Sequence, residues 1–275
     1  MSQDARPRIA VLPGERSYWE GRLRDAYSLD GVGWRGLGEP FNRWMYRVRR
    51  QLFLRRMRPL VKGRVPAVLD VGSGTGFYVE RWLELGAGSV TGSDITSTAV
   101  ERLRARFPAQ EFRRLDVSAN VDDLEPESFD AISAMDVLFH ITDDDAYERA
   151  VGNLARLLRP GGLLVLSENF VHGPALRSTH QASRSLVTIE GLLRSAGLEP
   201  LWRRPVFFLM NGPADSDSRV LRSSWGLTTR LLARRPGAGH VLGPLLAPVE
   251  LALASLRSEG PSTEMMVCRR VPAGT

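Results

Sequence analysis

The sequence predicts a doubly wound α/β domain built on a mostly parallel sheet, and three observations support this prediction. First, the stretch VLDVGSGTGF reads as a buried strand over residues 65–71 that carries an acidic residue near its end and enters a glycine-rich turn. Second, strand and helix patterns alternate after it, as is typical of parallel strands joined by crossover helices. Third, the 275 residues are 43% hydrophobic, so the chain can bury one large core with appendages.

The alternation can be followed from the glycine-rich turn onward. Helix patterns cover residues 77–88, 97–107 and 143–162. Strand patterns cover residues 89–94, 111–117, 128–140 and 163–170, and the third of these continues into an exit loop. We expect the helix over 143–162 to begin at an Asp cap and to end at Pro160, Gly161 and Gly162.

The glycine-rich turn predicts a ligand site, because glycines allow the backbone to approach a bound molecule closely. A dinucleotide site needs the spacing G-x-G-x-x-G, whereas Phe77 here occupies the place of the last glycine. The preceding Asp70 is better placed beside a cation than beside a pyrophosphate. The turn therefore favours a ligand with a positive group over a nicotinamide dinucleotide.

Four motifs together resemble the class I S-adenosylmethionine-dependent methyltransferases that act on small molecules. They are LDVGSGTGFY, VTGSDIT with Asp94 closing the second strand, LDVS after the third strand, and LLRPGGLLVLSE before the fifth. The similarity covers about residues 65–210. It implies a Rossmann-like sheet of seven strands, S-adenosyl-L-methionine as cofactor, and a methyltransferase enzyme of biosynthesis.

The resemblance also implies which residues bind the cofactor. The turn, with Gly72, Ser73 and Gly74, would pass under the methionine and ribose, and Asp70 would face the ammonium group. Gly76 would allow close helix packing. Asp94 would accept hydrogen bonds from both ribose hydroxyls. The residues implied at the adenine and beside the sulfonium are Ile95, Asp116, Val117, Met135 and Asp136.

Two histidines are candidates for a general base, because both follow core strands at the end of the sheet where ligands bind. His140 follows the fourth strand, and His180 lies in a segment that resembles the H-x-x-x-R-S stretch of many small-molecule methyltransferases. Loop histidines without function remain the alternative for both. The cluster Asp143, Asp144 and Asp145 is explained by a helix cap and its first turn, so no metal site is expected.

The flanking segments divide the chain into four parts. Residues 1–60 form a helical lid, with an apolar stripe over Phe41 to Leu52 and arginines beside it; a basic amphipathic helix on a membrane is the alternative. Residues 61–210 form the cofactor-binding core. Residues 211–262 form an insert of two helices, expected to be a cap or a homodimer face, and residues 263–275 form the final strand and tail. The second insert helix, broken by Pro244 and Pro248, is expected to be too short and interrupted to span a membrane.

Charge and cysteine content limit the partners. The net charge of +6 comes almost entirely from arginine and is spread along the chain, and no NPPY-like motif follows the fourth strand, so no nucleic-acid partner is expected. One cysteine and an N-terminus without an apolar stretch predict a cytoplasmic protein with no stable membrane insertion. The expected partner is a small-molecule acceptor. A nicotinamide oxidoreductase, a nucleic-acid methyltransferase, a silent partner subunit and a cofactor-dependent enzyme that does not methylate remain as alternatives.

Overall fold

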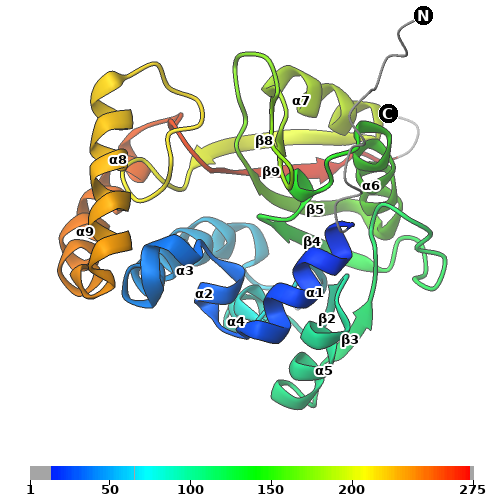
Figure 1. The fold of residues 1–275 in the computed structure, drawn as a ribbon. Helices are drawn as coiled ribbons and strands as arrows, with labels where there is room; N and C mark the ends of the chain where they lie inside the picture. Colours follow the sequence, from blue (N-terminus) through cyan, green and yellow to red (C-terminus); the bar gives the residue numbers. More distant parts are fainter. Residues whose placement is uncertain (1–13, 65, 273–275) are drawn as a thin grey trace, which may run out of the picture.

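The computed structural model describes residues 14–64 and 66–272, and places a seven-stranded sheet at the centre of the molecule with helices on both faces (Figure 1). The strands are β1 (Ala67–Val71), β2 (Ser89–Asp94), β3 (Glu111–Arg114), β4 (Phe129–Met135), β5 (Leu158–Glu168), β8 (Leu198–Pro205) and β9 (Glu264–Arg270). Their order is β3-β2-β1-β4-β5-β9-β8, and β9 alone runs against its neighbours. The predicted doubly wound, mostly parallel fold is confirmed.

Five of the nine α-helices in the described part of the chain begin with a side-chain cap. The nine are α1 (Glu15–Asp25), α2 (Leu29–Val32), α3 (Gly38–Val61), α4 (Phe77–Glu84), α5 (Ser97–Arg106), α6 (Asp144–Leu157), α7 (Leu186–Ser195), α8 (Arg219–Arg234) and α9 (Gly239–Leu256), with short 3₁₀ turns η1 (Arg35–Leu37), η2 (Leu138–His140) and η3 (Pro236–Ala238) and a small hairpin of β6 (Leu176–Arg177) and β7 (Ala182–Ser183). The side chain of Asp143 caps α6 by accepting from the amide of Ala146, as predicted.

Some predicted boundaries were wrong. The helix expected over 77–88 ends at Glu84, the strand expected over 111–117 ends at Arg114, and the largest difference is at the end of α6. The helix expected over 143–162 ends at Leu157, and residues 158–162 already belong to β5. Proline and glycine end a helix, but they do not prevent extended backbone, and here Leu158 pairs with Phe129 of β4. Residues 1–13 of the predicted lid, Val65 of the predicted first strand, and residues 273–275 of the predicted tail lie outside the described residues.

Two apolar clusters fill the spaces on the two faces of the sheet. One contains Trp82 of α4 and Phe53 of α3, and the other contains Tyr147 of α6, all of them fully buried. The apolar stripe of α3 is buried as predicted, because Phe41 and Leu52 both pack in the first cluster. The segment before the core is therefore joined to it through an apolar interface, which holds α3 beside the glycine-rich turn.

Helix α9 packs along α3 through two glycines one turn apart. A Cβ on Gly239 would lie 2.6 Å from the amide nitrogen of Phe41, and a Cβ on Gly243 would overlap the Trp44 ring. Glu250 of α9 is buried and accepts hydrogen bonds from the amides of Phe208, Leu209 and Met210, the last two at 2.9 and 2.8 Å. These contacts hold the insert, which lies between β8 and β9, against the N-terminal helices.

Among the described residues, one stretch, Pro236–Leu256, is long and apolar enough to cross a membrane when only length and composition are considered, with a mean hydropathy of 1.4. The expectation that this stretch is too short was therefore wrong. A core helix of a globular protein passes the same test, and the buried Glu250 with its three amide partners belongs to a helix that packs on protein. The expectation of no stable membrane insertion stays a prediction.

Replacing Gly243 tests the packing of α9 on α3. Alanine is normally favoured over glycine inside a helix by up to about 1 kcal/mol. At Gly243 the overlap of the added Cβ with Trp44 outweighs this preference. Gly243→Ala should therefore lower the free energy of unfolding by about 1–3 kcal/mol. Gly152→Ala in α6 is the matched control, because a Cβ there meets no atom within 4 Å, and it should be neutral or stabilising. Urea unfolding measures both; a Gly243→Ala variant as stable as the control would contradict this packing.

Candidate functional site

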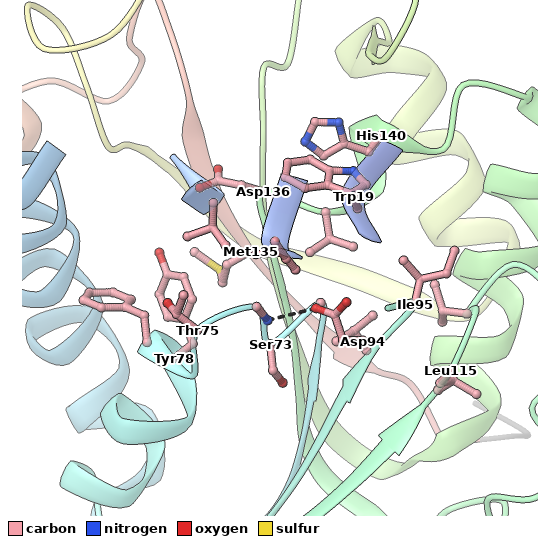
Figure 2. Close-up of a pocket in the computed structure, with 18 of the residues that line it drawn as sticks. Trp19, Ser73, Thr75, Tyr78, Asp94, Ile95, Leu115, Met135, Asp136 and His140 are labelled. Carbon is pink, nitrogen blue, oxygen red and sulfur yellow. Dashed lines mark hydrogen bonds between the residues drawn. The ribbon is translucent and has the colours of Figure 1, made fainter. Parts of the chain in front are cut away.

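The carboxyl ends of β1, β2 and β4 open into a cavity beside the glycine-rich turn (Figure 2). Ligands in open α/β sheets bind at this edge, where the strand order changes direction around β1 and β4. Most of the residues that the sequence predicted for a cofactor line it: Gly72, Ser73, Gly74, Asp94, Ile95, Asp116, Val117, Met135 and Asp136, together with His140. Asp70, Gly76 and His180 do not.

The glycine-rich turn is shaped by backbone that only glycine adopts without strain. Gly72 and Gly74 have φ of +67° and +52°, in the left-handed region. A Cβ on Gly72 would overlap Val137, and one on Gly74 would lie 3.1 Å from Val32 of α2. The amide of Ser73 donates to the carbonyl of Ser93 at 2.8 Å, which fixes the turn against β2. The glycines therefore let the turn, here called the cradle, pack directly against Val137 and Val32, which also line the cavity.

Gly76 has a different place from the other two glycines. It precedes α4 with φ of +84°, and a Cβ there would lie 2.8 Å from the side chain of Leu103 and would also crowd Phe107. It therefore allows α4 to start close against α5, the packing that the resemblance implied, and it does not line the cavity.

Asp94 holds the turn to the end of β2. One carboxylate oxygen, Oδ2, accepts from the amide of Gly74 at 2.9 Å, and the other, Oδ1, accepts from the amide and hydroxyl of Thr96 at 2.9 and 2.7 Å. A carboxylate offers about four acceptor positions, so Oδ2 keeps one for a ligand. Burial raises the pKa of Asp94. The arrangement suits one further hydroxyl donor; a second donor requires a change at Thr96.

Asp70 lies under the turn and faces away from the cavity. It is still inside β1, where it pairs in register with Ser133 of β4. The Ser133 hydroxyl donates to Oδ1 of Asp70 at 2.5 Å and accepts from the indole of Trp82 at 2.8 Å. Burial raises the pKa of Asp70 to about 7. The side chain ties two central strands together and does not line the cavity, so its implied role beside the ammonium group stays a prediction.

Asp136 forms the far wall of the cavity and has a strained backbone. Its φ of +59° is unusual for a residue with a side chain, and its amide donates to the hydroxyl of Ser167 at 2.8 Å. Oδ2 pairs with Nη1 of Arg49 at 2.5 Å, and the Arg49 side chain is only 10% exposed. Burial opposes the charge on Arg49, but Asp136 raises the pKa of Arg49 above its usual range. The sequence did not single out Arg49.

His140 lies where the first cavity meets a second one. Its Nδ1 is 2.8 Å from the carbonyl oxygen of His180, and its ring meets the edge of Trp19 with centroids 4.8 Å apart. Because a carbonyl only accepts, Nδ1 carries the hydrogen and Nε2 keeps a lone pair. Burial lowers the pKa of His140 to about 4, so the ring is neutral at neutral pH.

The second cavity extends from the first toward α8. The two share Trp19, Val32, Tyr46, Asp136 and His140. The aromatic rings that line the second cavity include those of Tyr18, Trp34, Phe139 and Trp225. Its polar lining residues include Arg22, Asn169, Gln181, Asn211 and Arg222. His180 also lines it and stacks on Tyr18, with ring centroids 4.1 Å apart. The predicted pair of histidines therefore reaches this second cavity.

Helix α1 covers both cavities and is anchored by Glu20. The carboxylate of Glu20 accepts from the amide of Ser97 at 2.7 Å and from the hydroxyl of Thr98 at 2.5 Å, so it caps the start of α5. Burial alone would raise the pKa of Glu20, but these hydrogen bonds lower it. Trp19 and Leu23 of the same helix line the first cavity. The sequence predicted a helical lid over residues 1–60, whereas the cap by Glu20 could not be foreseen.

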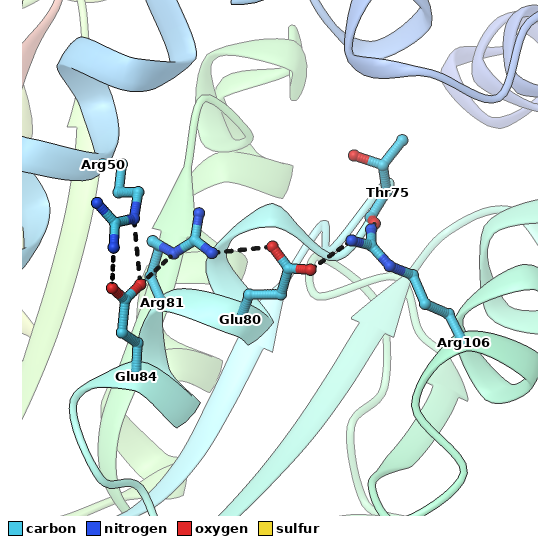
Figure 3. A network of polar contacts seen from close by, with 6 residues as sticks. All are labelled: Arg50, Thr75, Glu80, Arg81, Glu84 and Arg106. Atoms are coloured by element: carbon cyan, nitrogen blue, oxygen red, sulfur yellow. Dashed lines mark hydrogen bonds and ion pairs between the residues drawn. The ribbon is translucent and has the colours of Figure 1, made fainter.

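A network of charged side chains ties α3, α4 and α5 to the glycine-rich turn (Figure 3). Glu84 pairs with Arg50 of α3 and also with Arg81, at 3.0 Å. Arg81 pairs in addition with Glu80, at 2.9 Å. Glu80 pairs with Arg106, whose Nη1 donates to the carbonyl of Thr75 at 2.6 Å. Exposed ion pairs are individually weak, so the network orients these elements more than it stabilises them.

The cavity fits the adenosyl cofactor that the resemblance implies at most positions. At Gly72 and Gly74 any side chain would collide with Val137 or crowd Val32, two residues that line the same cavity. Ile95, Leu115 and Val117 give an apolar slot at one end, with the exposed Asp116 at its rim, where its Oδ1 accepts from the amide of Ser118 at 2.9 Å. The lining residues that sequence reasoning missed are Trp19, Leu23, Val32, Tyr46, Val71, Thr75, Phe77, Tyr78, Leu115, Val137 and Ile141.

Comparisons with known proteins agree with this geometry. Residues 68–162 match the family described as methyltransferase domain. A ubiquinone biosynthesis O-methyltransferase of Paracidovorax citrulli is 30% identical over 159 residues, which cover 50% of this chain and 65% of that protein, less than two thirds of its length.

Solved structures extend the likeness to the whole fold. The N-methyltransferase NodS of Bradyrhizobium japonicum, in complex with S-adenosylhomocysteine, covers 94% of this chain and 99% of its own at a TM-score of 0.54 and 15% identity. The [4+2]-cyclase SpnF covers 78% of this chain and 80% of its own at a TM-score of 0.51 and 20% identity. Identities this low establish a shared fold and no more.

The buried position of Asp70 predicts a pH dependence of stability. Its pKa rises from 3.8 to about 7 on folding, so between these values the folded state holds a proton that the unfolded state has lost. The contribution of Asp70 to stability therefore falls as pH rises from about 4 to about 7. Asp70→Asn, which stays neutral, should flatten this decline, measured by urea unfolding at about pH 5 and about pH 8. Asp122→Asn, on the exposed ion pair with Arg156, is the control; an unchanged profile in Asp70→Asn would refute the assignment.

Proposed function

We propose that the chain is an S-adenosylmethionine-dependent methyltransferase that methylates an oxygen or nitrogen atom of a small-molecule acceptor, because residues 68–162 match a methyltransferase domain and the fold is shared with a solved N-methyltransferase. The observation that supports the proposal best is the pair of cavities that meet at Asp136, His140 and Trp19. One cavity has the cofactor cradle, and the other has room and polar groups for an acceptor. We also propose that the protein works in the cytoplasm.

The residues of the first cavity would hold the cofactor through the shape of the cavity and two carboxyl side chains. When bound, S-adenosyl-L-methionine supplies an electrophilic methyl group on a sulfonium centre. The turn at Gly72 and Gly74 would support the ligand from below, and the free position on Oδ2 of Asp94 would take a ribose hydroxyl. Asp136, together with the rings of Tyr46 and Tyr78, would surround the cationic end.

Trp19 and Leu23 of α1 would exclude water from the junction of the two cavities. Methyl transfer is an in-line displacement, so most of the rate comes from holding donor and acceptor together in a dry site. Glu20 fixes α1 on α5, and Tyr27 of the following loop donates to the carbonyl of Gly74 at 3.0 Å. The cover is thus attached to both sides of the cofactor cradle.

His140 is the residue that we propose to accept the proton of the acceptor. Its Nδ1 is engaged by the carbonyl of His180, so Nε2 is the nitrogen that can receive a hydrogen bond. A base with a pKa of about 4 is weak, but a hydroxyl oxygen becomes strongly acidic as it gains the methyl group, so a weak base suffices. His180 would then position His140 through its carbonyl and bind the acceptor beside Tyr18.

The lining of the second cavity favours a flat acceptor, such as an aromatic secondary metabolite or a sugar-like molecule. Tyr18, Trp34, Phe139 and Trp225 can stack on the face of either kind of ring. A cofactor-dependent reaction without methylation is the second candidate, because the fold is shared with a [4+2]-cyclase. Release of S-adenosylhomocysteine during turnover distinguishes the two, since only methyl transfer produces it.

Cofactor binding can be tested at Asp94. Replacing Asp94 by Ala removes the acceptor for a ribose hydroxyl and also the support of Gly74, so affinity for S-adenosylhomocysteine should fall by about 1.5–3 kcal/mol. Asp122→Ala, at an exposed ion pair away from the cavity, should leave it unchanged. Calorimetry with S-adenosylhomocysteine and with NAD measures this. Binding heat with NAD and none with S-adenosylhomocysteine would overturn the proposed cofactor. An Asp94→Ala variant with unchanged affinity would remove Asp94 from the cofactor site.

Proton acceptance by His140 can be tested with His172 as the matched control. His140→Ala should lower the turnover rate by about a hundredfold or more while leaving cofactor affinity nearly unchanged. His172 is half exposed, pairs with Asp215 at 2.5 Å and lines neither cavity, so His172→Ala should keep the wild-type rate.

The same assay, run across pH, gives a second test. Because the pKa of His140 is lowered to about 4, the wild-type rate should fall only as pH approaches that value, where the ring gains its proton. A fall centred on the usual histidine value of about 6.5 would point to another group.

A further inference from the structure

Helices α8 and α9, joined by η3, form one edge of the molecule (Figure 1). Their inner faces are already occupied. Trp225 of α8 lines the second cavity and Leu232 is buried, while Gly243 and Glu250 of α9 meet the N-terminal helices and the loop after β8. The outer faces of both helices are exposed to solvent.

These outer faces are apolar where a soluble surface is normally polar. On α8, Val220, Leu227 and Leu231 are seven and four residues apart, so they share one face, and Leu227 is 65% exposed. On α9, Val241, Leu245 and Val249 follow each other at intervals of four, and Leu245 is 64% exposed. Each helix therefore presents an apolar stripe away from the core, and the two stripes need a partner.

Arginines border the stripe of α8, and neither helix carries an exposed acid, although the exposed Asp217 just before α8 pairs with Arg222. Arg219, Arg230, Arg234 and Arg235 are exposed, and within residues 14–64 and 66–272 none of them forms an ion pair. From residue 219 to residue 256 the sequence contains a single carboxylate, Glu250, and that side chain is fully buried. The outer surface of the two helices is thus apolar, and the exposed charged side chains on α8 are all arginines.

We propose that the outer faces of α8 and α9 bind the surface of an anionic lipid bilayer. Leucines and valines on such a surface enter the boundary between headgroups and acyl chains, while arginines stay with the phosphates. Because α9 remains packed on α3 through Gly239 and Gly243, the helices lie on the membrane and do not cross it. The protein would be peripheral and released by salt.

A second copy of the chain fits this surface less well. A twofold interface brings the same patch of both copies together, so the arginines around Leu227 and Leu231 would face their own equivalents. Like charges opposed across an interface are unfavourable, and no carboxylate is present on these faces to pair with them. A bilayer rich in phosphate groups supplies the missing negative charge.

Vesicle co-sedimentation of the whole chain tests this proposal without any assay of methyl transfer. The protein should sediment with vesicles of phosphatidylcholine and phosphatidylglycerol, much less with phosphatidylcholine alone, and binding should fall steeply between about 0.05 and 0.5 M NaCl. The double variant Leu227→Glu and Leu245→Glu should lose binding. Arg230→Gln with Arg234→Gln should weaken it about fivefold for each charge removed.

Val187→Glu is the matched control, because Val187 is an exposed apolar residue, 81% accessible, on α7 and outside the two stripes. It should bind as the wild type does, and unchanged affinity for S-adenosylhomocysteine would show that the variants fold. The proposal is wrong if the wild type does not bind anionic vesicles, or if the double variant Leu227→Glu and Leu245→Glu binds them as well as Val187→Glu does. It is equally wrong if the wild type is dimeric in solution and Leu227→Glu with Leu245→Glu makes it monomeric.

Discussion

The ion pair between the buried Arg49 and Asp136, which lines both cavities, joins the two halves of the site. Arg49 comes from α3, outside the sheet, and Asp136 follows β4 at the centre of it. Taking the Arg49 charge out of water is costly unless it meets an opposite charge, so the pair favours a position of α3 across the strand ends. That position of α3 also places Tyr46 in the cavity wall and provides the surface on which α9 packs. The cofactor cradle, the acceptor cavity and the insert all depend on it.

The sheet and the glycine-rich turn could be predicted because their signals are local. The turn at Gly72 and Gly74 and the acid at the end of β2 are each encoded within a few residues, and the structure brings them together in one cavity. The direction of a side chain within a strand was harder to predict. Asp70 immediately precedes the turn, yet its side chain points to Ser133, because its direction is set by the register of β1 with β4.

The residues that sequence reasoning missed come mostly from remote segments. Trp19, Val32 and Tyr46 line the first cavity, but they belong to helices that reach it only through tertiary packing. Glu20 is a similar case, since its partners Ser97 and Thr98 are far away in the sequence. Such contacts leave no periodic pattern in one sequence. The surface of α8 could be predicted only in part. Its amphipathic pattern is visible in the sequence, but only the fold shows that the side with Trp225 faces a cavity and the side with Leu227 faces solvent.

We propose that one cavity holds the cofactor and directs its reactive end into the other. A crystal structure with S-adenosylhomocysteine bound would show whether this is so. The ribose should lie at Oδ2 of Asp94, the adenine between Ile95 and Val117, and the sulfur should point past Asp136 toward His140 and the second cavity. A ligand bound elsewhere, or bound with its sulfur directed away from His140, would refute this arrangement of the two cavities.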